Sequence, residues 1–259
     1  MAISLASLQT GRPNAPFRMV LAGTPGVGKT SFACSAPAPV VLQTEDGVDA
    51  LIDAGLLPES LARFPKATTY AEILEALFAV YSEEHAFQTL VLDSLDWLEP
   101  VIHVETCRVQ GADSIEKVGG GWAKGYVEAL TQWREVFTAL NAIRETRKMN
   151  IILVAHSAVR RVEFPDSPPF DRYELKLNKH AHKLVEEWAD IVALAQFKVL
   201  FSTRTEGAGK AEKKITKAVG GADRVLYTSE RPSAVAKNRY GLPPELPLEW
   251  AAFETALRR

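Results

Sequence analysis

One glycine-rich segment constrains this chain of 259 residues more than any other feature. It reads Gly23-Thr24-Pro25-Gly26-Val27-Gly28-Lys29-Thr30 and follows an apolar run, residues 17–22, that predicts a buried strand. A Gly-x4-Gly-Lys-Thr pattern between a strand and a helix is typical of a loop whose backbone amides surround phosphate groups. An ordinary glycine-rich turn is the alternative, and the Lys-Thr pair with its flanking elements disfavours it.

The loop predicts specific roles for its side chains. We expect Lys29 to contact the β- and γ-phosphates of ATP and Thr30 to bind Mg²⁺. The predicted cofactor-binding set comprises residues 23–30 together with Ser31. The predicted cofactors are therefore ATP and Mg²⁺.

The rest of the pattern predicts an α/β fold. Short continuous apolar runs alternate with segments whose apolar residues recur every three or four positions, which favours a mostly parallel sheet with helices on both faces. The predicted strands are residues 17–22, 40–42, 90–92, 151–155 and 191–194, and the clearest helical stripes span 73–81 and 126–143.

The two ends of the chain differ from this pattern. Residues 197–201 and 224–227 alternate like strands and predict a C-terminal antiparallel extension, with 203–223 as its mobile hairpin tip. Residues 1–16 are small and polar and predict a flexible arm. We therefore expect one domain over residues 17–259.

Three polar residues follow predicted strands and are candidates for the chemistry. Asp93 would hold the magnesium ion, because the carboxyl ends of parallel strands face the ligand; capping of the next helix is the alternative. Glu45 would polarise the attacking water if its strand neighbours the phosphate-loop strand, and a solvated loop acid is its alternative. His156 would sense the γ-phosphate, or be simply a hydrogen-bonded strand-end histidine.

Composition limits the partners and the compartment. The net charge is −2 and the pI is about 6.2, so any nucleic-acid binding must come from local loops. No signal peptide or membrane span is expected, which predicts a cytoplasmic protein without a membrane partner. Cys34 and Cys107 are expected to be buried free thiols, with a disulfide as the less favoured alternative.

Three segments are candidates for contact with nucleic acid. In residues 110–124, Trp122 would stack on a base beside Lys124, or else begin a helix as a core aromatic. Residues 158–172 contain prolines that predict an irregular loop, either a neutral surface loop or a site that grips phosphates. Residues 204–224 have six basic against three acidic residues and would contact DNA or another subunit, or be a solvated hairpin. The basic candidates in the last two segments are Arg160, Arg161, Arg172, Lys213 and Lys214.

The order of these pieces resembles the RecA-like recombinase core, and in particular the phage-encoded, core-only ATP-binding proteins of that superfamily. The resembling segments are the phosphate loop, residues 44–47, 91–99, 171–176 and 236–243. The resemblance implies catalytic roles for Lys29, Glu45 and His156, although the family usually has Gln or Asn where this chain has His156. The Lys-Asn-Arg run is similar to one in hexameric helicases, which implies that Lys237 and Arg239 reach a neighbour's ATP site; a solvated basic loop is the alternative.

These features and this resemblance together predict an ATPase that acts on single-stranded DNA in annealing or recombination. It would assemble with itself into a ring or filament, with a single-strand-binding protein as a further partner. If phage-encoded, it would work in the bacterial host cytoplasm. A non-DNA ATPase that switches assembly, and a helicase-like ring motor, remain alternatives.

Overall fold

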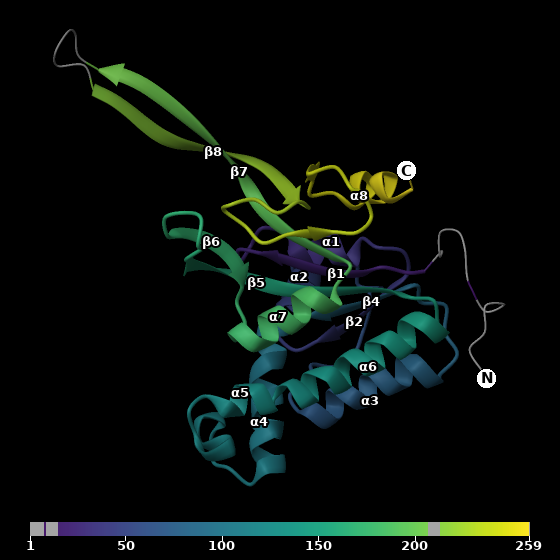
Figure 1. The fold of residues 1–259 in the computed structure, drawn as a ribbon. Helices are drawn as coiled ribbons and strands as arrows, with labels where there is room; N and C mark the ends of the chain where they lie inside the picture. The colour runs from purple at the N-terminus through teal and green to yellow at the C-terminus, as the bar shows by residue number, and fades with distance from the viewer. Residues whose placement is uncertain (1–7, 9–14, 207–212, 259) are drawn as a thin grey trace.

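A single mixed sheet of ten strands forms the centre of the molecule (Figure 1). The computed structural model describes residue 8 and residues 15–206 and 213–258, excluding the side chains of 199–219. The strand order is β10-β8-β7-β1-β5-β4-β2-β3, with β6 paired to β5 and β9 to β7. The strands are β1 (Arg18–Gly23), β2 (Pro39–Gln43), β3 (Ala62–Arg63), β4 (Thr89–Asp93), β5 (Asn150–Val162), β6 (Phe170–Leu175), β7 (Ile191–Glu206), β8 (Lys213–Tyr227), β9 (Lys237–Asn238) and β10 (Glu245–Pro247).

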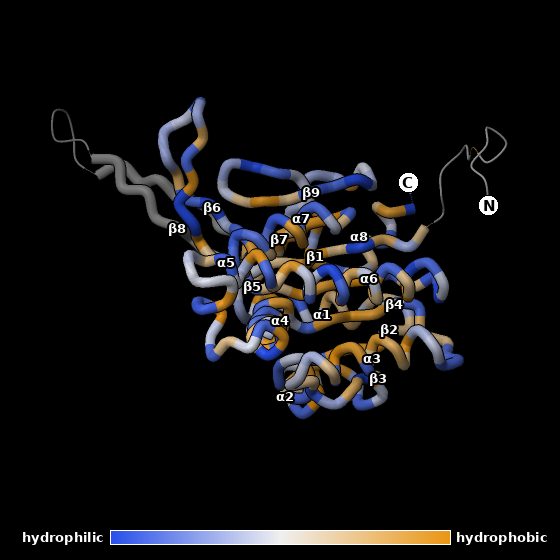
Figure 2. The backbone as a smooth tube through the Cα atoms, turned by 60° about the horizontal axis from the view of Figure 1, so that its bottom comes forward, coloured by the Kyte–Doolittle hydropathy of each residue, from blue (hydrophilic) through white to orange (hydrophobic). Residues whose placement is uncertain are grey.

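The middle of the sheet is parallel, from β7 through β1, β5, β4 and β2 to β3. Its main strands are apolar through their buried central residues, and Figure 2 shows β1, β4 and β2 as largely hydrophobic segments. Strands buried on both faces need such continuous apolar runs. Beyond β7, strands β8 and β10 are antiparallel, which confirms the predicted C-terminal extension.

Helices cover both faces of the sheet, as predicted. One core joins alternate strand residues, such as Val20 and Leu153, to α3, α4, α6 and α7. The other joins Leu21 and Ile152 to α1, α2 and α8. The helices are α1 (Lys29–Cys34), α2 (Gly47–Asp53), α3 (Tyr70–Ser82), α4 (Leu95–Gln110), the 3-10 helix η2 (Ile115–Gly120), α5 (Lys124–Glu128), α6 (Leu130–Thr146), α7 (Lys179–Trp188) and α8 (Trp250–Leu257).

Two predicted helical stripes need correction in detail. In α3, Ile73 and Leu77 are buried as expected, but Phe78 and Tyr81 are exposed, because the helix turns its Tyr70–Val80 face to the sheet. The segment predicted as one helix over 126–143 divides at Ala129 into α5 and α6.

The segment from 158 to 172 is a β-hairpin, not the irregular loop that its prolines predict. Strand β5 continues past the sheet to Val162 and pairs with β6 from Phe170 onward. The three prolines all fall in the connection between these strands, where no ladder hydrogen bond is needed.

A second hairpin, formed by β7 and β8, projects far from the body of the molecule (Figure 1). The predicted strands 191–194 and 197–201 are one continuous strand with an irregularity between Phe197 and Val199. Residues 203–206 and 213–223 of the predicted tip are therefore strand, whereas 207–212 lie outside the described residues, as does most of the predicted arm, residues 1–16.

Two smaller expectations concern the thiols and the membrane. Cys34 and Cys107 are free and half-buried, and burial raises the pKa of the Cys34 thiol to about 12. Among the helices that the structure describes, none has the length and apolarity to cross a bilayer.

Candidate nucleotide site

The phosphate loop connects the carboxyl end of β1 to α1, which begins at Lys29. Gly28 has φ 100°, a left-handed conformation that favours glycine. Lys29 is buried, and its Nζ donates hydrogen bonds to the carbonyl oxygens of Gly23 (3.1 Å) and Thr24 (3.0 Å). Burial lowers the pKa of Lys29, and the nearby Asp93, Asp96 and Glu45 carboxylates oppose that shift. The loop thus presents a cation and backbone amides, as phosphate binding requires.

The side chains of Thr30 and Asp93 meet at the carboxyl end of the parallel strands. The Thr30 hydroxyl donates to Asp93 Oδ2 at 2.6 Å. Burial raises the pKa of Asp93 to about 6, a shift that the Thr30 hydrogen bond opposes and Glu45 reinforces. The predicted alternative for Asp93, a cap on α4, does not occur, because Ser94 occupies the cap position without a side-chain cap bond. A hydroxyl and a carboxylate are hard oxygen donors, so the pair fits Mg²⁺.

Glu45 comes close to this pair, although its strand is not where we expected. Strand β2 is separated from β1 by β4 and β5, so the predicted adjacency is wrong. The turn after β2 is instead fixed to the turn after β4 by three hydrogen bonds of Thr44. Its N–H donates to the Asp93 carbonyl (2.7 Å), its hydroxyl donates to the Ser94 carbonyl (2.8 Å), and the hydroxyl oxygen accepts the Ser94 N–H (2.8 Å). Glu45 consequently lies near enough to affect the pKa of both Lys29 and Asp93.

His156 is held by a residue that the sequence did not single out for chemistry. It lies opposite Gly23 in the β1–β5 register, within a strand that continues past it. One oxygen of Asp96 accepts the His156 backbone N–H at 2.6 Å, and the other lies 2.5 Å from Nδ1. Asp96 also opposes the lowering of the Lys29 pKa, so its carboxylate lies near both His156 and Lys29. Its position three residues after Asp93 was the available signal, but helix starts commonly carry aspartate for capping.

The sequence as a whole matches the AAA domain family over residues 15–240, which is most of the chain. The chain belongs to this AAA domain family. No curated protein matches it. A solved structure that the chain resembles is the crystal structure of the RadB recombinase, with 14% identity, a TM-score of 0.44 and coverage of 86% of each chain. Membership together with the site geometry makes the chain a P-loop ATPase core.

In this AAA domain, Lys237 and Arg239 lie at the opposite end of the sheet from the phosphate loop. Strand β9 pairs with β7 at Ile191, whereas Gly23 pairs with β7 at Ala195. Four residues of parallel strand span about 13 Å. Lys237 and Arg239 are therefore too far from the phosphate loop to contact a nucleotide bound in their own subunit.

Lys237 and Arg239 both interact with groups of their own subunit. Lys237 Nζ donates to the carbonyls of Glu186 (2.7 Å) and Glu187 (3.0 Å) at the end of α7. Arg239 is half-exposed, and its Nη1 lies 3.4 Å from Asp190, a carboxylate that also pairs with Arg18.

Some of the residues predicted to contact nucleic acid are exposed on the AAA domain, and others are paired with neighbouring groups of the protein. Trp122 lies in the loop before α5 and is 93% exposed, so its alternative as a core aromatic is wrong. Lys124 and Arg161 are also exposed. Arg172, by contrast, is buried against Glu174 and Glu230, because the hairpin packs it there. Arg160 is half-buried and donates to the Leu177 carbonyl. The side chains of Lys213 and Lys214 lie outside the described set.

Proposed function

We propose that this AAA domain binds Mg²⁺-ATP and hydrolyses it, and that it does so as an oligomer that acts on single-stranded DNA in annealing or recombination. The observation that carries the nucleotide part is the convergence of Lys29, Thr30, Asp93 and Glu45 at one end of the parallel sheet. Lys29 would contact the terminal phosphates, and Thr30 and Asp93 would hold the ion. Glu45 would orient and deprotonate the attacking water.

The proposed action on DNA rests on exposed side chains in two segments, the loop before α5 and the β5–β6 hairpin. Trp122 offers a ring for base stacking, and Arg161 on the β5–β6 hairpin offers a cation for phosphate. Strand β5 contains His156 and continues into this hairpin, and we propose that a change sensed by His156 at the γ-phosphate would be transmitted along β5 to Arg161. Such a path would couple ATP to DNA binding.

The assembly part rests on charge at the amino end of the sheet. Asp190 lies within 4.0 Å of guanidinium nitrogens from Arg18, Arg144 and Arg239, so one carboxylate faces three cations. The unneutralised charge suits the phosphates of a neighbouring subunit's nucleotide, and Arg239 is the half-exposed member able to reach them.

One observation favours a second candidate, an ATPase that switches the assembly of a complex without binding DNA. The chain is slightly acidic, and Arg160 and Arg172 are engaged with acidic or carbonyl groups. This arrangement removes two of the cations expected to grip DNA phosphates.

The ATPase rate with and without single-stranded DNA separates the two candidates. The DNA-acting protein should be stimulated by single-stranded DNA and should bind it less tightly as salt rises, because phosphate contacts release counterions. Replacing Arg161 with Ala should weaken binding and flatten the salt slope by about one unit. Arg134→Ala, an exposed arginine on α6, is the matched control. No binding at low salt with or without ATP would favour the assembly switch.

A further inference from the structure

The sheet order divides the surroundings of the phosphate loop into two sides. Glu45, Asp93 and His156 lie on or after β2, β4 and β5, all to one side of β1. A nucleotide whose terminal phosphate faced these groups would extend away from them across the loop, and its α-phosphate and nucleoside would lie toward β7 and β8.

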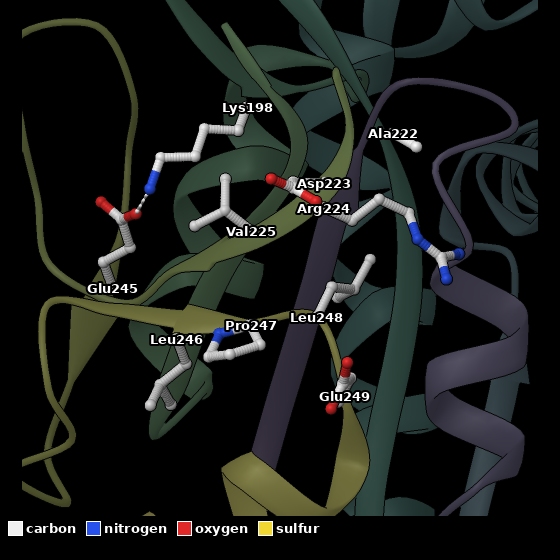
Figure 3. A pocket seen from close by; sticks show the side chains of 10 residues that line it. All are labelled: Lys198, Ala222, Asp223, Arg224, Val225, Glu245, Leu246, Pro247, Leu248 and Glu249. Atoms are coloured by element: carbon white, nitrogen blue, oxygen red, sulfur yellow. Dashed lines mark hydrogen bonds and ion pairs between the residues drawn. The ribbon is translucent and has the colours of Figure 1, made fainter. Parts of the chain in front are cut away.

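Arg224 on β8 reaches the loop from that second side. Its Nη1 lies 3.4 Å from the Val27 carbonyl oxygen. A Cβ added to Gly28 would fall only 2.3 Å from the same nitrogen, so the guanidinium lies directly against the loop backbone. Figure 3 shows the side chain extending from β8 toward the start of α1, at one end of a cleft of about 530 Å³ beside β10.

The charge of Arg224 is available for an anion. Among the side chains that the structure describes, no carboxylate lies within 4.0 Å of it, and its side-chain hydrogen bond goes to a loop carbonyl. Lys29 makes the same kind of contact on the other side of the loop. Lys198, the other cation of the cleft, differs because Glu245 neutralises it at 3.1 Å.

The backbone of Arg224 is fixed at the base of the long hairpin. Its carbonyl accepts the Leu248 N–H at 3.1 Å, and the following residues pair with β10. The side chain is therefore presented from a braced part of the sheet, a favourable position for a ligand contact.

We propose that Arg224 is a second phosphate-binding cation of this site, supplied within the subunit to the α-phosphate of the bound nucleotide. The role rests on the proposed nucleotide function. Because ATP and ADP share the α-phosphate, Arg224 contributes equally to the binding of both. It differs in this from a finger that acts on the transferring γ-phosphate.

Isothermal titration calorimetry with Mg²⁺-ATP and Mg²⁺-ADP tests the role. Arg224→Ala should weaken both nucleotides by at least about tenfold, as the loss of a charged hydrogen bond implies. Arg224→Lys, which keeps the charge, should lose less. Lys198→Ala is the matched control, and its affinities should stay within about twofold of the wild type.

Three results would overturn the role of Arg224. They are wild-type affinities in Arg224→Ala, a loss confined to ATP, or an equal loss in Lys198→Ala. If Lys29→Ala loses binding while Arg224→Ala keeps it, only this role fails. If the wild-type protein binds neither nucleotide, the proposed function fails with it.

Discussion

The contact between Asp96 and His156 predicts a measurable loss of stability when it is removed. The carboxylate of Asp96 is 6% exposed and accepts the His156 backbone N–H at 2.6 Å. Its second oxygen lies 2.5 Å from His156 Nδ1 and accepts the Ser94 hydroxyl at 3.2 Å. Replacing Asp96 with Ala leaves these groups without this acceptor at the carboxyl end of the parallel strands.

The magnitude follows from these contacts. An unsatisfied buried donor costs about 1–3 kcal/mol, and a hydrogen bond to a charged group is worth about 1.5–3 kcal/mol. Because the bonds share one carboxylate, their effects are not additive. We expect Asp96→Ala to lower the free energy of unfolding by about 2–4 kcal/mol. Asp96→Asn should lose less, because its amide oxygen still accepts the backbone N–H.

Urea denaturation measures this difference. Asp113→Ala is the matched control, since Asp113 is exposed and its ion pair with the exposed Lys117 is a contact worth about 0.2–1 kcal/mol. In a His156→Ala background, Asp96→Ala should cost about 1 kcal/mol less, because the ring contact is already gone. A free energy of unfolding for Asp96→Ala within about 0.5 kcal/mol of the wild-type value would show that the Asp96 contacts do not stabilise the fold.

Two other predictions concern pH and assembly. Burial raises the pKa of Glu99 to about 7, even though its carboxylate accepts the Asn178 backbone N–H. The folded state therefore favours the protonated carboxyl, and this contribution is present below pH about 4.5 and lost as the pH rises through about 7. Urea titrations from pH 5 to 8 should show the wild type losing stability relative to Glu99→Gln, and parallel curves would contradict this. Arg239→Ala should bind ATP but hydrolyse it slowly, and mixing it with Lys29→Ala should restore part of the steady-state rate; a fully active Arg239→Ala, or no gain in any mixture, would exclude a finger in trans.

The parts of the molecule that local sequence determines could be predicted. A strand, a Gly-x4-Gly-Lys-Thr loop and a helix are adjacent in the chain, so the loop around Lys29 needed no long-range information. Asp93 followed in the same way, because a carboxylate at the end of a buried strand faces the ligand edge. Continuous apolar strands also predicted the parallel sheet and its two layers of helices.

The features that the sequence did not predict depend on contacts between segments that lie far apart in the chain. The neighbours of β2 are set by packing of the whole sheet, and it is the Thr44 contacts with the turn after β4 that bring Glu45 near Asp93. The prolines at 165, 168 and 169 predict an irregular loop over residues 158–172, because their spacing does not reveal that they occupy only the connection between two strands. Asp96, Arg172 and Arg224 are ordinary charged residues in sequence, and only folding brings them to His156, Glu230 and Gly28.

The proposed hydrolysis of ATP, with Glu45 acting on the attacking water, is tested by ATP binding and single-turnover hydrolysis by the wild type, Glu45→Gln and Lys29→Ala, each with Mg²⁺ and single-stranded DNA. Asp46→Asn is the matched control, because Asp46 adjoins Glu45 but pairs with Lys66 at the surface.

Glu45→Gln should bind ATP about as tightly as the wild type and hydrolyse it at least about 100-fold more slowly, the range that general-base catalysis supplies. Lys29→Ala should bind ATP weakly and show no turnover, and Asp46→Asn should match the wild type. Wild-type hydrolysis by Glu45→Gln, or normal turnover by a folded Lys29→Ala protein, would rule out these roles.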